Sequence, residues 1–259
     1  MAIMIFLLMG CAEDNVEEMP NEETEEEIIP ETDEKEELEA EIPVEEIKEP
    51  LYELNEETWG FQPIDDANAQ VVLLTFDDAP DKHALNMAKT LRALDAPAIF
   101  FVNGHFIDSD EGKAVLKEIH DLGFPIGNHT KTHADLQQLS EIDQKKEILF
   151  VSDTVEEVIG ERPEFFRAPY GQNTDYSRKL VKEEGMLLMN WSFGYDWVKE
   201  YMDVNAIADV MVNAQELGSG ANLLMHDREW TAGALQDIVE GLRAKGYDFI
   251  DPATIKGVE

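Results

Sequence analysis

The stretch from Val71 to Asp78, which reads VVLLTFDD, decides the fold of this chain. Its first six residues carry no charge and are apolar or β-branched, which is typical of a strand buried on both faces of a parallel sheet. Two adjacent carboxylates, Asp77 and Asp78, follow at its end. In parallel α/β folds the carboxyl ends of the strands share one edge, and sites assemble there. The stretch therefore predicts an α/β fold and the edge that carries its chemistry.

The chain beyond this stretch alternates between apolar runs and amphipathic segments. Further strands are expected at residues 98–102, 125–128, 164–167, 186–191, 221–225 and 247–250. Helices are expected at residues 83–94, 111–122, 140–159, 176–184, 204–217 and 232–245. Six or seven strand–helix units fit a closed or nearly closed barrel better than a small open sheet. We therefore expect a (β/α) barrel.

A block of like charge precedes this region. Between Glu13 and Glu57 the chain has 22 acidic residues against Lys35 and Lys48, a net charge of −20 out of −37. Such blocks repel, solvate and stay extended. Residues 12–57 are therefore expected to form a disordered acidic linker, although glutamate runs also favour a charged helix over part of it. The rest of the chain is also acidic, which argues against binding nucleic acid or an anionic membrane surface by charge.

The single cysteine, Cys11, excludes an internal disulfide. An apolar run over residues 2–9 precedes it, and Leu8–Cys11 resembles the lipobox of bacterial lipoproteins, in which the cysteine receives lipid and becomes the first residue. The run is too short to span a bilayer, and no lysine or arginine stands before it. We expect residues 1–11 to be a lipoprotein-type signal segment. The alternative is an ordinary apolar N-terminus with an incidental thiol.

Three side chains that follow apolar strands are of the types that bind a divalent cation. His129 and His133 stand four apart after the strand at 125–128, and Asp78 ends the strand at 71–78. Two neutral imidazoles and one carboxylate leave coordination positions open, as in catalytic rather than structural sites. The spacing of two histidines is weak by itself, because a histidine is more often a hydrogen-bonded loop residue. Its place at a strand end favours a metal site.

Two further residues would complete an acid–base pair. A metal site of this kind would suit the hydrolysis of an amide. In that reaction Asp77 is expected to be the base that deprotonates the attacking water, and His226 is expected to be the acid that protonates the leaving amine. Histidine suits the second role because its usual pKa lies near neutrality. The alternatives are a helix N-cap for one of the aspartates and a satisfied buried histidine for His226.

The remaining candidates would position these groups. Arg167 is expected to pair with the base and to relieve the repulsion between the two neighbouring carboxylates. Asp196 is expected to orient His226 and to raise its pKa. The backbone N–H of Tyr170 is expected to stabilise the oxyanion. For Tyr170, Trp197 and Leu224, a place in the core or in the wall of the groove is an equally good interpretation.

These motifs give the chain a resemblance to a known family. Over residues 70–250 it resembles polysaccharide deacetylases of the NodB-homology type, carbohydrate esterase family 4. Five motifs match in order: Thr75–Asp78, His129–His133, Arg167–Tyr170, Asp196-Trp197 and Leu224–His226. Two positions depart from the family pattern, since Ala79 replaces a glycine and Phe193 an aspartate. The second departure leaves rim contacts and substrate choice open.

The resemblance implies a distorted (β/α) barrel, which we assign to residues 58–259. It implies a divalent metal, zinc first, with cobalt, manganese or nickel as alternatives. It also implies the roles proposed above for the candidate residues. The metal ligands would be Asp78, His129 and His133, the base would be Asp77 and the acid would be His226, with Arg167 and Asp196 as positioning residues. Trp197 and Leu224 would form a small apolar pocket for the acetyl methyl group.

We therefore expect a lipid-anchored monomer at the outer face of the membrane or in the cell wall. Its expected reaction is metal-dependent hydrolysis of N-acetyl groups on a wall polysaccharide, first of all peptidoglycan N-acetylglucosamine, with release of acetate. Alternative substrates are chitin oligomers, poly-N-acetylglucosamine and O-acetylated xylan. Rivals of another class are a non-catalytic glycan-binding lipoprotein and a structural lipoprotein whose acidic linker is the functional part. The complete set of candidate residues argues against the first of these two.

Overall fold

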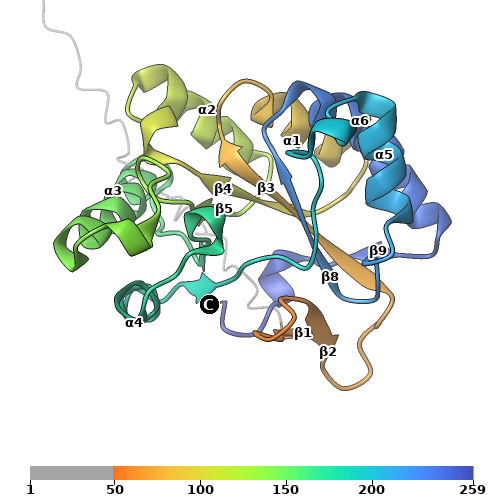
Figure 1. The fold of residues 1–259 in the computed structure, drawn as a ribbon, viewed down its shortest axis with the longest axis horizontal. Helices are drawn as coiled ribbons and strands as arrows, with labels where there is room; N and C mark the ends of the chain where they lie inside the picture. Colours follow the sequence, from red (N-terminus) through yellow and green to blue (C-terminus); the bar gives the residue numbers. More distant parts are fainter. Residues whose placement is uncertain (1–48, 259) are drawn as a thin grey trace, which may run out of the picture. The chain divides into compact units, whose positions relative to one another are not determined.

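A computed structural model describes residues 49–258 of the chain (Figure 1). The predicted lipid-anchor residue, Cys11, and the predicted linker before residue 49 lie outside the described residues. Within residues 49–258, no helix combines the length and the apolar character that crossing a bilayer requires.

A curled parallel sheet forms the centre of the described domain (Figure 1). Its strands are β3 (Val71–Ala79), β4 (Ala98–Val102), β5 (Ile126–Asn128), β6 (Phe165–Phe166), β7 (Leu187–Leu188), β8 (Ala221–His226) and β9 (Asp248–Phe249). Their order is β7-β6-β5-β4-β3-β8, and β9 pairs with the beginning of β3. One parallel bridge, Phe193 to Leu223, joins the segment after β7 to β8. The sheet is thus a half-barrel, which confirms the expected distorted (β/α) barrel.

Helices cover the outer face of this sheet. They are α1 (Ala84–Ala93), α2 (Asp110–Asp121), α3 (Glu141–Ile159), α4 (Asp175–Glu183), α5 (Val204–Asn213) and α6 (Glu229–Ala244). Short 3₁₀ turns are η1 (Gly104–Phe106), η2 (Leu136–Gln138), η3 (Pro169–Gly171), η4 (Lys199–Tyr201) and η5 (Pro252–Thr254). The main apolar core joins α1, α2, α3, α5 and α6 to the sheet. As expected, Ser140 caps α3 and Gly160 ends it with a φ of 88°.

Alternation along β3 explains how an apolar strand delivers polar side chains to a site. Val72, Leu74 and Phe76 belong to the core beneath the helices. The side chains between them point to the inside of the half-barrel, because successive residues of a strand face opposite ways. Thr75 and Asp77 therefore lie inside, and both are buried.

A small antiparallel hairpin precedes the parallel sheet, and the sequence pattern did not reveal it. It consists of β1 (Tyr52–Leu54) and β2 (Phe61–Pro63). Tyr52 is buried and forms a bridge with Ile255 near the end of the described chain. Residues 52–54 fall within the predicted linker but form part of the folded domain. The prediction was wrong here because it followed the acidic composition of the segment and did not take the buried Tyr52 into account.

Candidate active site

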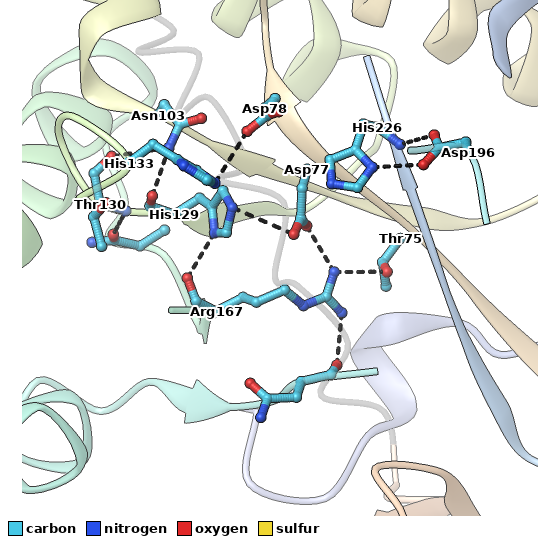
Figure 2. Close-up of polar contacts among 12 residues, drawn as sticks. Thr75, Asp77, Asp78, Asn103, His129, Thr130, His133, Arg167, Asp196 and His226 are labelled. Atoms are coloured by element: carbon cyan, nitrogen blue, oxygen red, sulfur yellow. Dashed lines mark hydrogen bonds and ion pairs between the residues drawn. The ribbon is translucent and has the colours of Figure 1, made fainter. Parts of the chain in front are cut away.

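The candidate residues that Figure 2 labels gather at the carboxyl edge of the sheet, where the strands β3, β5, β6 and β8 end. Asp77 and Asp78 lie near the end of β3, and His226 ends β8. His129 directly follows β5, and Arg167 directly follows β6. Strand register places Asp77 opposite His226. The sheet therefore brings together residues that are 149 positions apart in sequence.

Asp78, His129 and His133 form a cluster of metal-ligand type. One donor atom from each can be chosen so that all three lie within 4.8 Å of one another. The Oδ1 atom of Asp78 lies 3.6 Å from Nε2 of His133. The backbone carbonyl of Arg167 accepts a hydrogen bond from Nδ1 of His129 at 2.7 Å, which directs Nε2 into the site. Metal-ligating histidines are usually oriented in this way, by donating the N–H of the second ring nitrogen to an acceptor in the protein.

The electrostatics of this cluster favour the donor form of two of its members. Burial lowers the pKa of the His133 imidazole, and the neighbouring His129 lowers it further. Burial raises the pKa of the Asp78 carboxyl, but the surrounding histidines and Arg228 outweigh burial and hold that pKa below its usual value. At neutral pH the cluster thus offers a neutral imidazole and a carboxylate, which are the forms that bind cations.

Asp77 is fixed by a guanidinium that is fully buried. Nη1 of Arg167 donates to Oδ1 of Asp77 at 2.7 Å and to the Thr75 hydroxyl at 2.9 Å, and Nη2 donates to the Asn190 carbonyl at 2.9 Å. The guanidinium also lies 4.2 Å from the centre of the Phe101 ring. Oδ1 is held in this way, and Oδ2 of Asp77 lies 3.4 Å from Nε2 of His129, beside the cation-ligand cluster. The predicted Arg167–Asp77 pair is present.

His226 is held by Asp196 through two hydrogen bonds. Nδ1 of His226 lies 2.7 Å from Oδ1 of Asp196, and the backbone N–H of His226 donates to Oδ2 at 2.6 Å. The Thr231 hydroxyl donates to the same Oδ2 at 2.8 Å. Burial lowers the pKa of His226, but the hydrogen bond and charge of Asp196, with the charges of Asp77 and Asp78, outweigh burial and raise it. The predicted pairing of Asp196 with His226 is present.

Aromatic side chains line the opening of the site. Tyr170 is 62% exposed and its ring centre lies 4.9 Å from that of His133. Trp197 is 44% exposed and its ring centre lies 5.4 Å from that of His226. Leu224 is buried and shares the inward face of β8 with His226, two residues further on. Of the two exposed rings, that of Tyr170 therefore lies beside His133 and that of Trp197 lies beside His226.

Two residues at the end of β8 belong to the site although they were not among the candidates. The buried Asp227 accepts hydrogen bonds from consecutive backbone N–H groups at the start of α1. Nη2 of Arg228 donates to Oδ2 of Asp78 at 2.7 Å. A sequence signal for Asp227 did exist, because the residue before α1, His83, is not of a type that usually caps a helix, and its side chain makes no cap.

Three further residues have partners outside the reacting groups. His105 is exposed beside the Lys131 carbonyl, and His120 lies 3.0 Å from Glu161 on the surface. Phe193, one of the two departures from the expected motif pattern, is buried in the core and forms the parallel bridge to Leu223. Its role is in the fold and not at the rim of the site.

The fold and the site together define a hydrolase of the α/β class, with its reacting groups at the carboxyl edge of a curled parallel sheet. The sequence model of the polysaccharide deacetylase family matches residues 65–189. A peptidoglycan-N-acetylglucosamine deacetylase of Bacillus cereus is 31% identical over 193 residues, which cover 70% of this chain and 68% of that protein. The chain belongs to the polysaccharide deacetylase family, and it is a deacetylase.

Solved structures agree with this assignment. The peptidoglycan deacetylase PdaC from Bacillus subtilis matches with a TM-score of 0.64 and 29% identity, over 72% of this chain and 90% of that chain. A family 4 carbohydrate esterase from Streptomyces lividans, in complex with acetate, matches with a TM-score of 0.62 and 27% identity. That match covers 70% of this chain and 91% of the esterase chain.

Proposed function

We propose that this chain is a cation-dependent N-deacetylase of a bacterial wall polysaccharide, with the N-acetylglucosamine of peptidoglycan as its substrate. The observation that carries the proposal is a ligand set flanked by two acid–base groups. Asp78, His129 and His133 offer donor atoms within 4.8 Å of one another. Asp77 and His226 stand opposite each other on the adjoining strands β3 and β8. Amide hydrolysis needs a polarised carbonyl, a base and an acid, and this arrangement supplies a group for each.

The donor set fits a divalent cation, and zinc is our first choice. The Asp78 to His133 separation of 3.6 Å is close to the edge of a tetrahedron whose metal–ligand bonds are about 2.1 Å long, roughly 3.4 Å. Two imidazoles and one carboxylate suit zinc and also accept cobalt, manganese or nickel. When bound here, such a cation would supply Lewis-acid polarisation of the acetyl carbonyl and would lower the pKa of water.

The side chains of the chain would then move the protons. Arg167 holds Oδ1 of Asp77, so Oδ2 accepts a proton from the attacking water. The water oxygen forms a bond to the acetyl carbon, and the bond from that carbon to nitrogen breaks. The leaving nitrogen takes its proton from His226, whose protonated form Asp196 stabilises. The products are acetate and a free glucosamine unit.

The rim residues would bind and orient the acetyl group. In our proposal the Tyr170 N–H donates to the developing oxyanion, while Trp197 and Leu224 form the apolar pocket for the methyl group. The exposed Tyr170 and Trp197 rings also offer flat apolar faces for a sugar ring. The position of these rings on either side of the site suits a substrate that lies across the opening.

Peptidoglycan is preferred because similar proteins act on it according to their names. A Bacillus cereus relative is a peptidoglycan-N-acetylglucosamine deacetylase, and PdaC from Bacillus subtilis is a peptidoglycan deacetylase. Chitin oligomers, poly-N-acetylglucosamine and O-acetylated xylan offer the same acetyl group on other polymers. They are the alternatives that a substrate panel separates.

We further propose that Cys11 carries a lipid that anchors the enzyme at the outer face of the membrane, as the lipobox-like Leu8–Cys11 suggests. The acidic residues after it would form a tether that reaches into the wall. Radiolabelled palmitate incorporation in a bacterial host tests this proposal. The native chain should incorporate label and Cys11→Ser should not. Equal labelling of both would refute the anchor.

The decisive variant for the chemistry is Asp77→Asn. It keeps the size of the side chain but removes the base, so turnover should fall by about 10²–10⁴-fold. Cation binding, measured by isothermal titration calorimetry, should persist because Asp78, His129 and His133 remain. Activity near that of the native enzyme would show that Asp77 is not the base. An absence of cation binding by the native chain would refute the metal site itself.

A further inference from the structure

Asp227 is a buried carboxylate whose charge is balanced by backbone groups. It is 2% exposed, and among the described residues no lysine or arginine pairs with its carboxylate. Its Oδ2 accepts from the N–H groups of Asp81, Lys82 and Ala84 at 2.7, 3.0 and 3.0 Å. Its Oδ1 accepts from the N–H of His83 at 2.6 Å. A buried anion needs such compensation, because burial without partners is strongly unfavourable.

These contacts replace the missing N-cap of α1. The N-cap residue, His83, makes no side-chain cap, and the first turn of α1 contains no acidic residue. Asp227 lies 143 positions further along the chain than Ala84, and its negative charge faces the N-terminal end of the helix. Free N–H groups and the helix dipole both favour an anion there. Asp227 thus caps α1 from the end of β8.

The same residue holds both sides of Asp78. On the N-terminal side of Asp78, the N–H of Asp227 donates to the carbonyl of Asp77 at 3.0 Å. On the C-terminal side of Asp78, the carboxylate of Asp227 accepts hydrogen bonds from the N–H groups of residues 81–84. Asp78 itself has a φ of 59°, in the left-handed region that residues with a β-carbon disfavour. An unfavourable backbone conformation persists only where its surroundings enforce it, and Asp227 contacts the chain on either side.

We propose that Asp227 is a positioning residue that holds Asp78 in its cation-binding conformation. The inference rests on the proposed function, since it assigns Asp227 to the same cation site. Asp227 would act only through the backbone and would touch neither cation nor substrate. It would also tie the acid, His226, to the end of β3, which carries the base and the ligand, because it directly follows His226 in sequence. Residues that orient metal ligands in this way typically change metal affinity by about 10–100-fold when mutated.

The test compares Asp227→Asn with Asp203→Asn in the full-length chain. Asp203 also caps a helix, α5, by accepting from the N–H groups of Asn205 and Ala206 at 2.9 and 3.1 Å. Asparagine keeps one acceptor oxygen but turns an NH₂ group toward the backbone donors. Zinc titration should give an affinity lower by about tenfold or more for Asp227→Asn and within about twofold of native for Asp203→Asn. Both variants should lose some thermal stability.

A measurement on the native chain keeps the inference testable if Asp227→Asn does not fold. Cation binding to Asp78 and closure of the loop by Asp227 should reinforce each other, because coupling between two sites is reciprocal. Zinc should therefore slow hydrogen exchange at the amides of residues 81–84, and it should leave the amides of Asn205 and Ala206 unchanged.

The outcomes separate two kinds of failure. If the native chain binds no zinc, the proposed function is wrong and the inference falls with it. If the native chain binds zinc, the inference is wrong where Asp227→Asn binds it equally tightly. It is also wrong where zinc leaves exchange at residues 81–84 unchanged. In either case Asp227 is only a helix cap.

Discussion

At the scale of single residues, Arg167 organises the inside of the half-barrel. It is fully buried and reaches Thr75, Asp77 and the Asn190 carbonyl. The sequence predicted its pairing with Asp77, because adjacent carboxylates at a strand end need a cation. It could not predict the other two partners, since these depend on how the sheet curls.

Arg167→Met should be strongly destabilising. The substitution leaves the buried Asp77 carboxylate without its cation, and breaking a buried pair in this way costs about 3–5 kcal/mol. Arg162 is a matched control, because it has three acidic partners but a side chain that is 33% exposed. Arg162→Met should cost at most about 1 kcal/mol. Urea unfolding with a chelator present measures both variants, and similar losses would contradict the assigned burial of the pair.

Asp196→Asn should shift the pH profile of the reaction. Asp196 helps to raise the pKa of His226 against the lowering effect of burial, so the protonated acid persists to higher pH in the native enzyme. Without the carboxylate charge, the pKa of His226 should fall. The alkaline decline of kcat/KM, which reports the free enzyme, should therefore move to lower pH. Asp209→Asn, an exposed change on α5, should leave the profile unchanged, and an unmoved alkaline limb in Asp196→Asn would refute the role of Asp196.

The same pKa shift has a consequence for stability. Because the folded pKa of His226 lies above the usual value, protonation of His226 stabilises the fold at low pH. This contribution is complete below the unfolded pKa and is lost as the pH rises through the folded pKa. Asp196→Asn should therefore reduce the stability difference between mildly acidic and alkaline conditions.

At the scale of elements, the apolar runs predicted the strands well where each run is long. β3, β4 and β8 match the expected positions closely. β6, β7 and β9 are only two residues long, and the broader apolar runs around them continue into loops. Periodicity identifies the buried face of a segment, whereas the extent of pairing is set by neighbouring strands. The β1–β2 hairpin escaped prediction because each strand has three residues and lies among acidic or turn residues.

Gly127→Ala tests how tightly the short strand β5 packs inside the sheet. A β-carbon at Gly127 would lie 2.4 Å from the Phe101 ring, so the ring or the strand must shift. Such overpacking typically costs about 1–3 kcal/mol. Gly218→Ala is the control, because a β-carbon there meets nothing within 4 Å. Denaturant unfolding should show a lower free energy of unfolding for Gly127→Ala than for Gly218→Ala. A Gly127→Ala variant as stable as the native protein would contradict the close approach of Phe101.

At the scale of the whole molecule, the sequence indicated the architecture and the location of the site. The strand-end placement of Asp78, His129 and His226 was enough, because a parallel sheet brings its carboxyl ends to one edge. The contacts of Asp227 and Arg228 were missed, since they join the residues that follow β8 to the start of α1 and to the end of β3. The predicted division at residue 57 also cuts through the folded region that begins with β1.

Truncation tests where the folded domain begins. A chain that starts at residue 49 should unfold at nearly the same temperature as the full-length protein. A chain that starts at residue 58 lacks β1 and the buried Tyr52. Burying one large apolar side chain contributes about 2–3 kcal/mol, and each kcal/mol moves Tm by about 2–4 °C in a domain of this size. The shorter chain should therefore melt about 4–12 °C lower, and equal Tm values would remove β1 from the stable fold.

The most direct test of the central claim is acetate release by the full-length chain, assayed zinc-loaded and chelator-treated, on peptidoglycan and on chitin oligomers. The account predicts release from peptidoglycan that stops on chelation and returns when zinc is added back. Release from chitin oligomers alone would keep the chemistry and change the substrate. Zinc binding without acetate release from either polymer would contradict the assignment of the Asp77–His226 site as an N-deacetylase.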